Sequence, residues 1–131
     1  MNKRQRKKYA KKKGTYVPNK ELWNLDLTIC DWIIPRLIKF RELNFGYPCI
    51  DRKIFAETKE MVYINFEDWK SILYKIILAF ELIRTDPIDI AEKRNIKITS
   101  EEEFENLCNE RQEKIERGLD LFKYYIQDLW W

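Results

Sequence analysis

The sequence predicts an all-α fold, a small helical bundle of three long helices that follows a basic N-terminal tail. Glycine is scarce at three residues and proline at four, which favours helices over a turn-rich β fold. Three long segments repeat apolar residues at steps of three and four, the spacing of one helix face. A length of 131 residues predicts one domain. We divide it into a basic tail and linker, residues 1–20, and a helical domain, residues 21–131.

The first long helix is expected over residues 21–44. Pro35 interrupts it, because proline lacks an amide donor and collides with the carbonyl of Asp31, so a kink or a restart is expected there. Pro48 cannot continue a helix, so residues 44–48 form a break. The apolar repeat assigns the following residues to the core: Leu22, Leu25, Ile29, Trp32 or Ile33, Leu37, Phe40 and Leu43. Trp23 is also expected in the core.

Two further helices follow the break. Asn65 is expected to cap the first, and Asp86-Pro87 to start a short helical turn after it. Ser100 and Glu103 form a capping-box pattern for the last helix, which is expected to reach about residue 129. The predicted core face of the middle helix is Phe66, Trp69, Leu73, Ile76, Phe80 and Ile83. That of the last helix is Phe104, Cys108, Ile115, Leu119, Phe122, Ile126 and Leu129.

Residues 49–64, between the first and middle helices, have an ambiguous pattern. Residues 61–64 form a short β-like run, and residues 53–56 can pair with it. The sequence therefore predicts a short β-hairpin insertion in the bundle.

The charge of the chain is unevenly distributed. Residues 1–13 contain eight basic residues and no acid, which leaves 17 basic and 22 acidic residues in the remainder, a net charge of −5. Such a tail attracts phosphate-rich polymers or an acidic surface, and it is equally typical of a disordered, solubilising leader. The candidate nucleic-acid-binding residues are Lys3, Arg4, Arg6, Lys7, Lys8, Lys11, Lys12 and Lys13.

The chain lacks the residues that several classes of enzyme and metal site require. There is no histidine for Ser-His or Cys-His catalysis, and the three glycines are too far apart for a phosphate loop. Cys30, Cys49 and Cys108 have neither the even number nor the spacing of a disulfide framework or a zinc site. We therefore expect no enzyme, no catalytic residue, no metal and no cofactor.

One alternative is a magnesium-dependent all-α nucleotide pyrophosphohydrolase, which holds magnesium with acids in an EExxE and ExxD pattern. Asp120 follows Glu116 by four residues instead of three, and all the acids belong to one predicted helix. Glutamates at the start of that helix are also explained by capping. The acids that carry this alternative are Glu101, Glu102, Glu105, Glu116 and Asp120.

Aromatic and basic residues around the helix breaks predict a ligand site. Tyr47 in the break and the terminal pair Trp130 and Trp131 can stack on a base. Arg36, Arg41 and Arg84 can contact phosphates. We expect the helix with Pro35, the Gly46-Tyr47-Pro48 break and the terminal tryptophans to border one concave site. The alternative is that these aromatics pack in the core and the arginines are solvated.

Several short motifs together resemble a family of small proteins encoded by tailed bacteriophages. They are Trp23-Asn24-Leu25-Asp26, Ile34-Pro35-Arg36-Leu37 with Phe40, Gly46-Tyr47-Pro48, Phe66-Glu67 with Trp69 and Ile72, Ala79-Phe80-Glu81, Gly118-Leu119-Asp120-Leu121-Phe122 and Leu129-Trp130-Trp131. The resemblance covers most of residues 23–131. It is lost at residues 49–64, which look like an insertion, and in the basic tail.

The resemblance implies a phage accessory binding protein in the host cell cytoplasm. It carries over no catalytic residue. It favours a host-defence antagonist that sequesters a small nucleotide immune signal or binds a host defence protein, with homo-oligomers common among such proteins. The alternative is a nucleic-acid-binding accessory protein acting through the tail. The sequence lacks an apolar run long enough to span a membrane and begins without a signal peptide, so no membrane association is expected.

Overall fold

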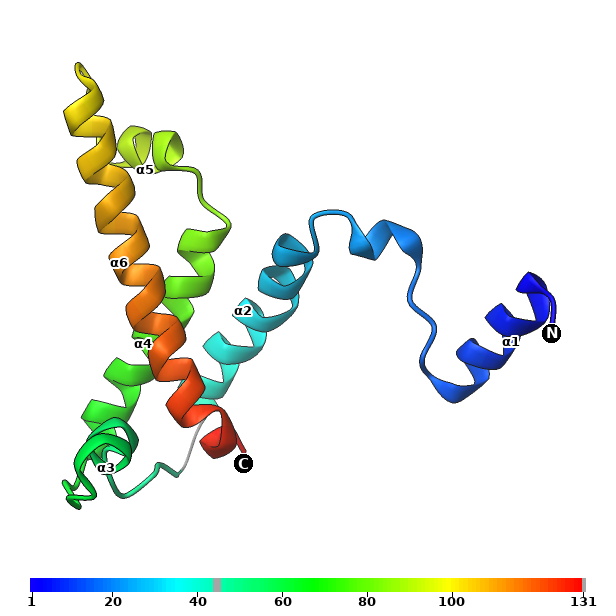
Figure 1. Cartoon of the computed structure of the whole chain (residues 1–131). Helices are drawn as coiled ribbons and strands as arrows, with labels where there is room; N and C mark the ends of the chain where they lie inside the picture. The colour runs from blue at the N-terminus through cyan, green and yellow to red at the C-terminus, as the bar shows by residue number, and fades with distance from the viewer. Residues whose placement is uncertain (44–45, 131) are drawn as a thin grey trace.

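The computed structural model describes residues 1–43 and 46–130, and its regular elements are helical (Figure 1). This confirms the all-α class. The described residues form six α-helices instead of three, together with two short 3₁₀ helices. In order, they are α1 (Lys3–Lys13), η1 (Asn19–Leu22), α2 (Leu25–Leu43), α3 (Arg52–Thr58), α4 (Phe66–Ile83), α5 (Pro87–Lys93), α6 (Glu101–Tyr125) and η2 (Ile126–Asp128).

The predicted β-hairpin at residues 49–64 is wrong. Residues 53–56 lie inside α3 instead of pairing with residues 61–64, and a single antiparallel bridge joins Ile50, before this helix, to Tyr63 after it. The carboxylate of Asp51 accepts a hydrogen bond from the backbone N–H of Ile54 and so caps α3 at its first turn. Lys59 ends the helix in the left-handed conformation, with φ 62°. These local caps favour a helix where the β-like composition predicted a strand.

The centre of the bundle is α4, against which both α2 and α6 pack (Figure 1). Its start is the predicted one, because Asn65 and Asp68 exchange hydrogen bonds between each side chain and the other's backbone N–H. The prediction of its buried face is confirmed at Trp69, Leu73, Ile76 and Phe80; Phe66 and Ile83 are half-buried. Asp86 and Pro87 start α5 as expected.

The last helix, α6, lies very close to α4 at Gly118. A Cβ atom there would overlap the side chain of Ala79 and the carbonyl oxygen of Lys75. This explains why glycine is tolerated inside a long helix, where it costs about 1 kcal/mol relative to alanine.

The predicted face and end of α6 need correction. Ser100 caps the helix as predicted, but the α-helix ends at Tyr125 and continues only as η2. Of the residues assigned to its core face, Ile115 is buried, Cys108, Phe122 and Leu129 are half-buried, and Phe104, Leu119 and Ile126 are exposed. The buried positions of α6 face α4 and α5: Leu107, Ile115, Gly118 and Tyr125.

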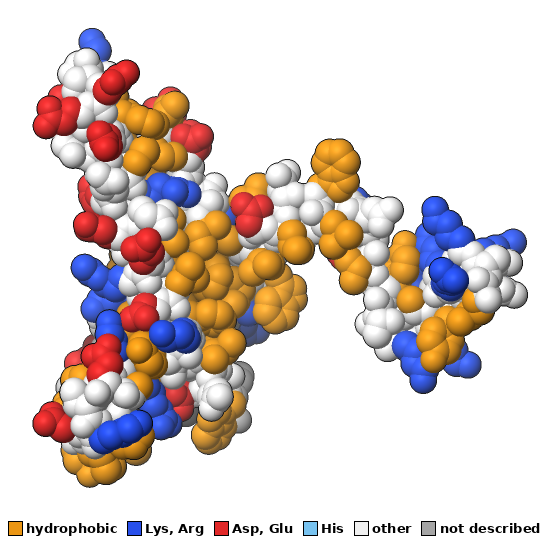
Figure 2. Space-filling model, viewed as in Figure 1, with side chains coloured by type: hydrophobic (Ala, Val, Ile, Leu, Met, Phe, Trp, Pro, Cys, Tyr) orange, Lys and Arg blue, Asp and Glu red, His pale blue; other side chains and the backbone are white. Residues whose placement is uncertain are grey.

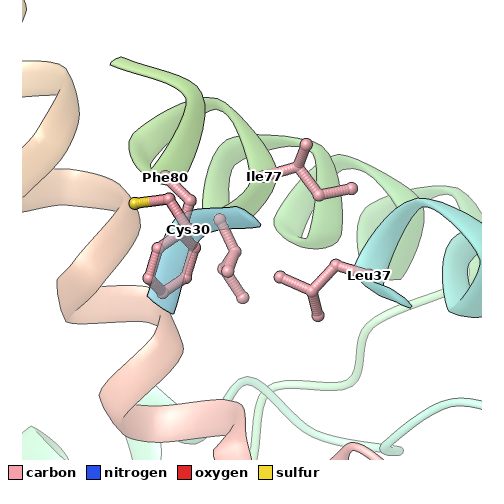
Figure 3. Packing of buried hydrophobic residues seen from close by; sticks show 5 residues of the cluster. Cys30, Leu37, Ile77 and Phe80 are labelled. Atoms are coloured by element: carbon pink, nitrogen blue, oxygen red, sulfur yellow. The ribbon is translucent and has the colours of Figure 1, made fainter. Parts of the chain in front are cut away.

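The interior between α2 and α4 is apolar (Figure 3). Cys30 and Leu37 of α2 lie against Ile77 and Phe80 of α4, with Ile76 in the same cluster. Burial raises the pKa of the Cys30 thiol, which keeps it protonated and consistent with a packing role.

The course of α2 differs from the prediction in two ways. It begins at Leu25 instead of residue 21, and of the kink or restart expected at Pro35 the restart does not occur, because one helix continues through this residue. Its predicted core residues are divided, with Leu37 buried and Ile33 and Phe40 half-buried. The others lie in solvent: Leu22, Trp23, Leu25, Ile29, Trp32 and Leu43. The helix is apolar on two faces, and α4 covers only one of them.

The N-terminal tail contains a helix that the sequence did not predict. No other element of the described chain packs against α1, and none of its residues is buried. In Figure 1 it stands away from the bundle, beyond η1 and the start of α2. Among the described helices, none has the length and apolar character needed to cross a bilayer.

Candidate functional site

The predicted nucleotide ligands on α2 are engaged by their own helix or by α4. The guanidinium of Arg36 donates to the carbonyl oxygen of Trp32 at 2.7 Å and lies 4.3 Å from the centre of its ring. Arg41 is half-buried, and its Nε donates to the carbonyl oxygen of Lys70 on α4 at 3.0 Å. The two arginines therefore serve α2 and its packing on α4.

The third predicted phosphate ligand lies at the other end of α4. Arg84 pairs with Asp31, with 2.8 Å between Nε and Oδ1. Lys70, which binds Arg41, precedes Arg84 by 14 positions, or about 21 Å along a helix axis. One phosphate therefore cannot contact both Arg41 and Arg84.

Arg84 is the predicted ligand that lines a sizeable hollow, of about 760 Å³. That volume is sufficient for a small ligand. Its walls combine three basic side chains with three acidic ones: Arg84, Lys93, Arg94, Glu81, Asp89 and Glu92. The hollow thus offers no excess of positive charge to an anion.

The predicted stacking aromatics are not gathered around that hollow. The exposed ring of Tyr47 lies 5.9 Å from that of Phe66, at the opposite end of α4 from Arg84. Trp130 follows η2 and is 71% exposed. Trp131 lies outside the described residues.

The acids of the hydrolase alternative are spread along α6. Glu102 and Glu116 are 14 positions apart, about 21 Å along the helix. Asp120 pairs with Lys53 of α3 at 2.9 Å, which holds the pKa of its carboxyl below the usual range. Within the described residues, no cluster of three or more potential metal ligands is present. The structure therefore gives the acidic pattern no common site.

The concentrated charge of α1 makes it the remaining candidate. Residues four apart lie above one another on a helix, about 6 Å apart. Two such rows run along neighbouring sides of α1. Lys3, Lys7 and Lys11 form one row; Arg4, Lys8 and Lys12 form the other. Both rows consist only of cations, and the helix contains no acid.

Capping residues at both ends stabilise α1, although the positive charges of its side chains repel one another. At its start, Asn2 and Gln5 exchange hydrogen bonds between side chain and backbone N–H at 2.9 Å. At its end, Gly14 adopts the left-handed conformation that glycine tolerates, with φ 73°. Like charges four apart each cost a helix about 0.2–0.5 kcal/mol, so bound anions should stabilise α1.

Tyr16 belongs to the same site, although the sequence did not single it out. The chain turns back after Gly14, and the Nζ atoms of Lys7 and Lys11 lie 5.2 and 5.0 Å from the centre of the Tyr16 ring. The site thus combines a row of ammonium groups with one aromatic face. The sequence signal that could have identified Tyr16 is its position two residues after Gly14, the glycine that caps the end of α1.

No protein-family model matches the chain, and no curated protein or solved structure matches it. The resemblance to phage proteins therefore remains a prediction.

Proposed function

We propose that this chain is a non-enzymatic nucleic-acid-binding protein that contacts the phosphate backbone through α1. The observation that carries the proposal is the pair of cation rows on a helix that no other described element covers. Phosphate contacts supply affinity without reading sequence, and lysine and arginine are the residues that make them. The phage setting implied by the resemblance makes it an accessory protein acting in an infected cell.

The charge of α1 sets the expected strength of the salt effect. If the six cations of the two rows each neutralise one phosphate, the logarithm of the affinity for duplex DNA should fall with log salt at a slope of about −5. Affinity then drops on the order of a thousandfold between 50 and 200 mM salt. Binding should depend little on base sequence, because contacts to phosphates carry no sequence information.

The test is fluorescence anisotropy of labelled DNA and RNA duplexes at several salt concentrations. Replacing Lys3, Lys7 and Lys11 with glutamine should make the slope less steep by about three, because three phosphate contacts are lost. Glutamine preserves helix propensity, so the helix is changed in charge alone. Binding that is insensitive to salt would contradict the proposal.

A matched control removes the same charge from the bundle. Lys75, Lys93 and Lys97 are exposed lysines outside α1, and their replacement with glutamine should leave the slope unchanged. If both triple variants weaken binding equally, net charge is responsible instead of the rows. Deleting residues 1–17 should abolish binding and leave the Tm nearly unchanged, since α1 buries nothing.

Sequestration of a small nucleotide signal is the second candidate. The volume of the hollow at Arg84, about 760 Å³, favours it, whereas the equal number of acidic and basic side chains in its walls does not. The site would be smaller than predicted, without Arg36, Arg41 or Tyr47. A thermal-shift panel of nucleotides and cyclic nucleotide signals tests it, since a ligand at a hundredfold excess over its Kd stabilises by about 2.7 kcal/mol. The Arg84→Ala variant should lose that shift. A panel without any shift would exclude this candidate.

A further inference from the structure

The aromatic ring of Tyr16 lies beside one of the two rows of cations on α1. The row consists of Lys3, Lys7 and Lys11, which follow one another at steps of four residues on one side of the helix. The Nζ atoms of Lys7 and Lys11 lie 5.2 and 5.0 Å from the centre of the Tyr16 ring. A molecule that lies along this row therefore meets the ring at the last two lysines.

The position of the ring is set by the end of the helix. Gly14 adopts the left-handed conformation and turns the chain back toward α1. The backbone N–H of Thr15 then donates to the carbonyl oxygen of Ala10 at 2.9 Å. Tyr16 follows directly, so these backbone contacts hold its ring on the cationic surface.

The ammonium groups beside Tyr16 are not paired with acids. Among the described residues, the ion pairs lie within the bundle, and none includes a cation of α1. A lysine has three N–H donors, so a contact with a ring leaves donors for other partners. Lys7 and Lys11 can therefore bind phosphates while they stay next to Tyr16.

The bundle does not cover this ring. Tyr16 is half-buried, and it belongs to none of the three hydrophobic clusters of the core. Figure 1 shows α1 standing away from the bundle. In Figure 2, Lys and Arg side chains gather over α1 with hydrophobic side chains among them. Part of the ring is thus accessible next to cations that lack a partner.

Cations beside an aromatic ring suit a strand whose bases are unpaired. In a duplex each base is stacked between its neighbours, whereas the base of a single strand can stack on an aromatic side chain. One sugar separates the base of a nucleotide from its phosphate, so a base whose phosphate binds Lys7 or Lys11 can reach Tyr16. Proteins that bind single strands without sequence preference combine the same two features.

We propose that α1 binds single-stranded nucleic acid, with phosphates on the row of Lys3, Lys7 and Lys11 and one base stacked on Tyr16. This inference rests on the proposed function and adds the substrate class, which is a strand with unpaired bases. Stacking releases no counterions, so its contribution to affinity should persist as salt weakens the phosphate contacts.

Anisotropy titrations of the full chain with the Tyr16→Leu substitution test the inference. The labelled probes are oligothymidine, oligouridine and a long blunt duplex, each at several salt concentrations. Leucine keeps an apolar side chain but removes the ring, so binding to both single strands should weaken by about five- to a hundredfold, the value of one base–aromatic stack. The factor should be the same at every salt concentration, and the affinity for the duplex should not change.

Two further variants serve as controls. Tyr16→Phe keeps the ring and should bind all three probes like the wild type. Tyr9→Leu is the matched control, because Tyr9 also lies near an ammonium group, with the Nζ atom of Lys13 5.7 Å from its ring centre. Tyr9 is on the opposite side of α1 from Lys7 and Lys11, so its loss should leave the affinity for single strands nearly unchanged.

Three results would overturn the inference while the proposed function stands. An equal loss on single strands and duplex would mean that Tyr16 only stabilises α1. An unchanged affinity of Tyr16→Leu for single strands, or an equal loss in Tyr9→Leu, would mean that no base stacks on Tyr16 in particular. In each case the wild type still binds with a steep dependence on salt. A wild type that binds none of the probes would remove the proposed function and this inference together.

Discussion

The guanidinium of Arg52 donates to both carboxylate oxygens of Asp128, at 3.2 and 2.9 Å. The backbone N–H of Arg52 also donates to the hydroxyl of the buried Tyr125 at 3.0 Å. These bonds join the start of α3 to the C-terminal end of the bundle. Since the carboxylate of Asp128 is only 11% exposed, it depends on this partner.

Arg52→Ala should therefore lower the free energy of unfolding by about 1 kcal/mol, because a largely buried carboxylate loses its partner, while the exposed side of the pair limits the loss. Urea denaturation measures the change. Lys53→Ala is the control: its ion pair with Asp120 is more exposed, and a much smaller effect is expected. If both substitutions lowered the free energy of unfolding equally, the two hydrogen bonds between Arg52 and Asp128 would stabilise the fold no more than the exposed ion pair of Lys53.

A second prediction concerns the contact between α4 and α6. Gly118→Ala should destabilise the protein by about 1–3 kcal/mol, although alanine is the better helix former, because the added methyl overlaps Ala79 and the backbone of Lys75. Thermal unfolding measures this loss.

Asn109→Ala supplies the comparison for Gly118, since Asn109 is an exposed position on the same helix. Only helix propensity changes there, so its Tm should stay level or rise slightly. A Gly118→Ala protein as stable as the wild type would show that α4 and α6 can separate at no cost.

These contacts also indicate which parts of the fold the sequence could predict. For α4, the Asn65 cap and a regular repeat from Phe66 to Ile83 are local signals that agree with the packing. For α3, seven residues are too few to show a period, and their composition resembles a strand. In α2, the repeat was real but belonged to two faces, so Ile29 was assigned to the core in place of its neighbour Cys30.

The candidate sites, like the fold, could be predicted only in part. The cations of α1 could be predicted because they are contiguous in the chain. The proposed grouping of Arg36, Arg41 and Arg84 depended on how α2 packs on α4, which periodicity does not give. Leu25, Ile29 and Trp32 of α2 were assigned to the core although they are exposed, because a repeat of apolar residues does not show whether another part of the chain covers it.

The third prediction is the pH dependence of stability at Glu110. Its hydrogen bond to Lys114 and its contact with Arg94 lower the pKa of this carboxyl from its ordinary value of 4.5. A folded-state pKa below the unfolded one stabilises the fold above pH 4.5, and this contribution is lost as the pH falls through the folded-state pKa. Because the three side chains are partly exposed, the effect should stay below about 1 kcal/mol.

Glu110→Gln should accordingly lower the Tm at neutral pH, and the difference from the wild type should disappear in acid. Glu113→Gln, an exposed change on the same helix, should leave the Tm-against-pH curve of the wild type unaltered. A constant offset between Glu110→Gln and the wild type at every pH would show that the ionisation of Glu110 is not involved.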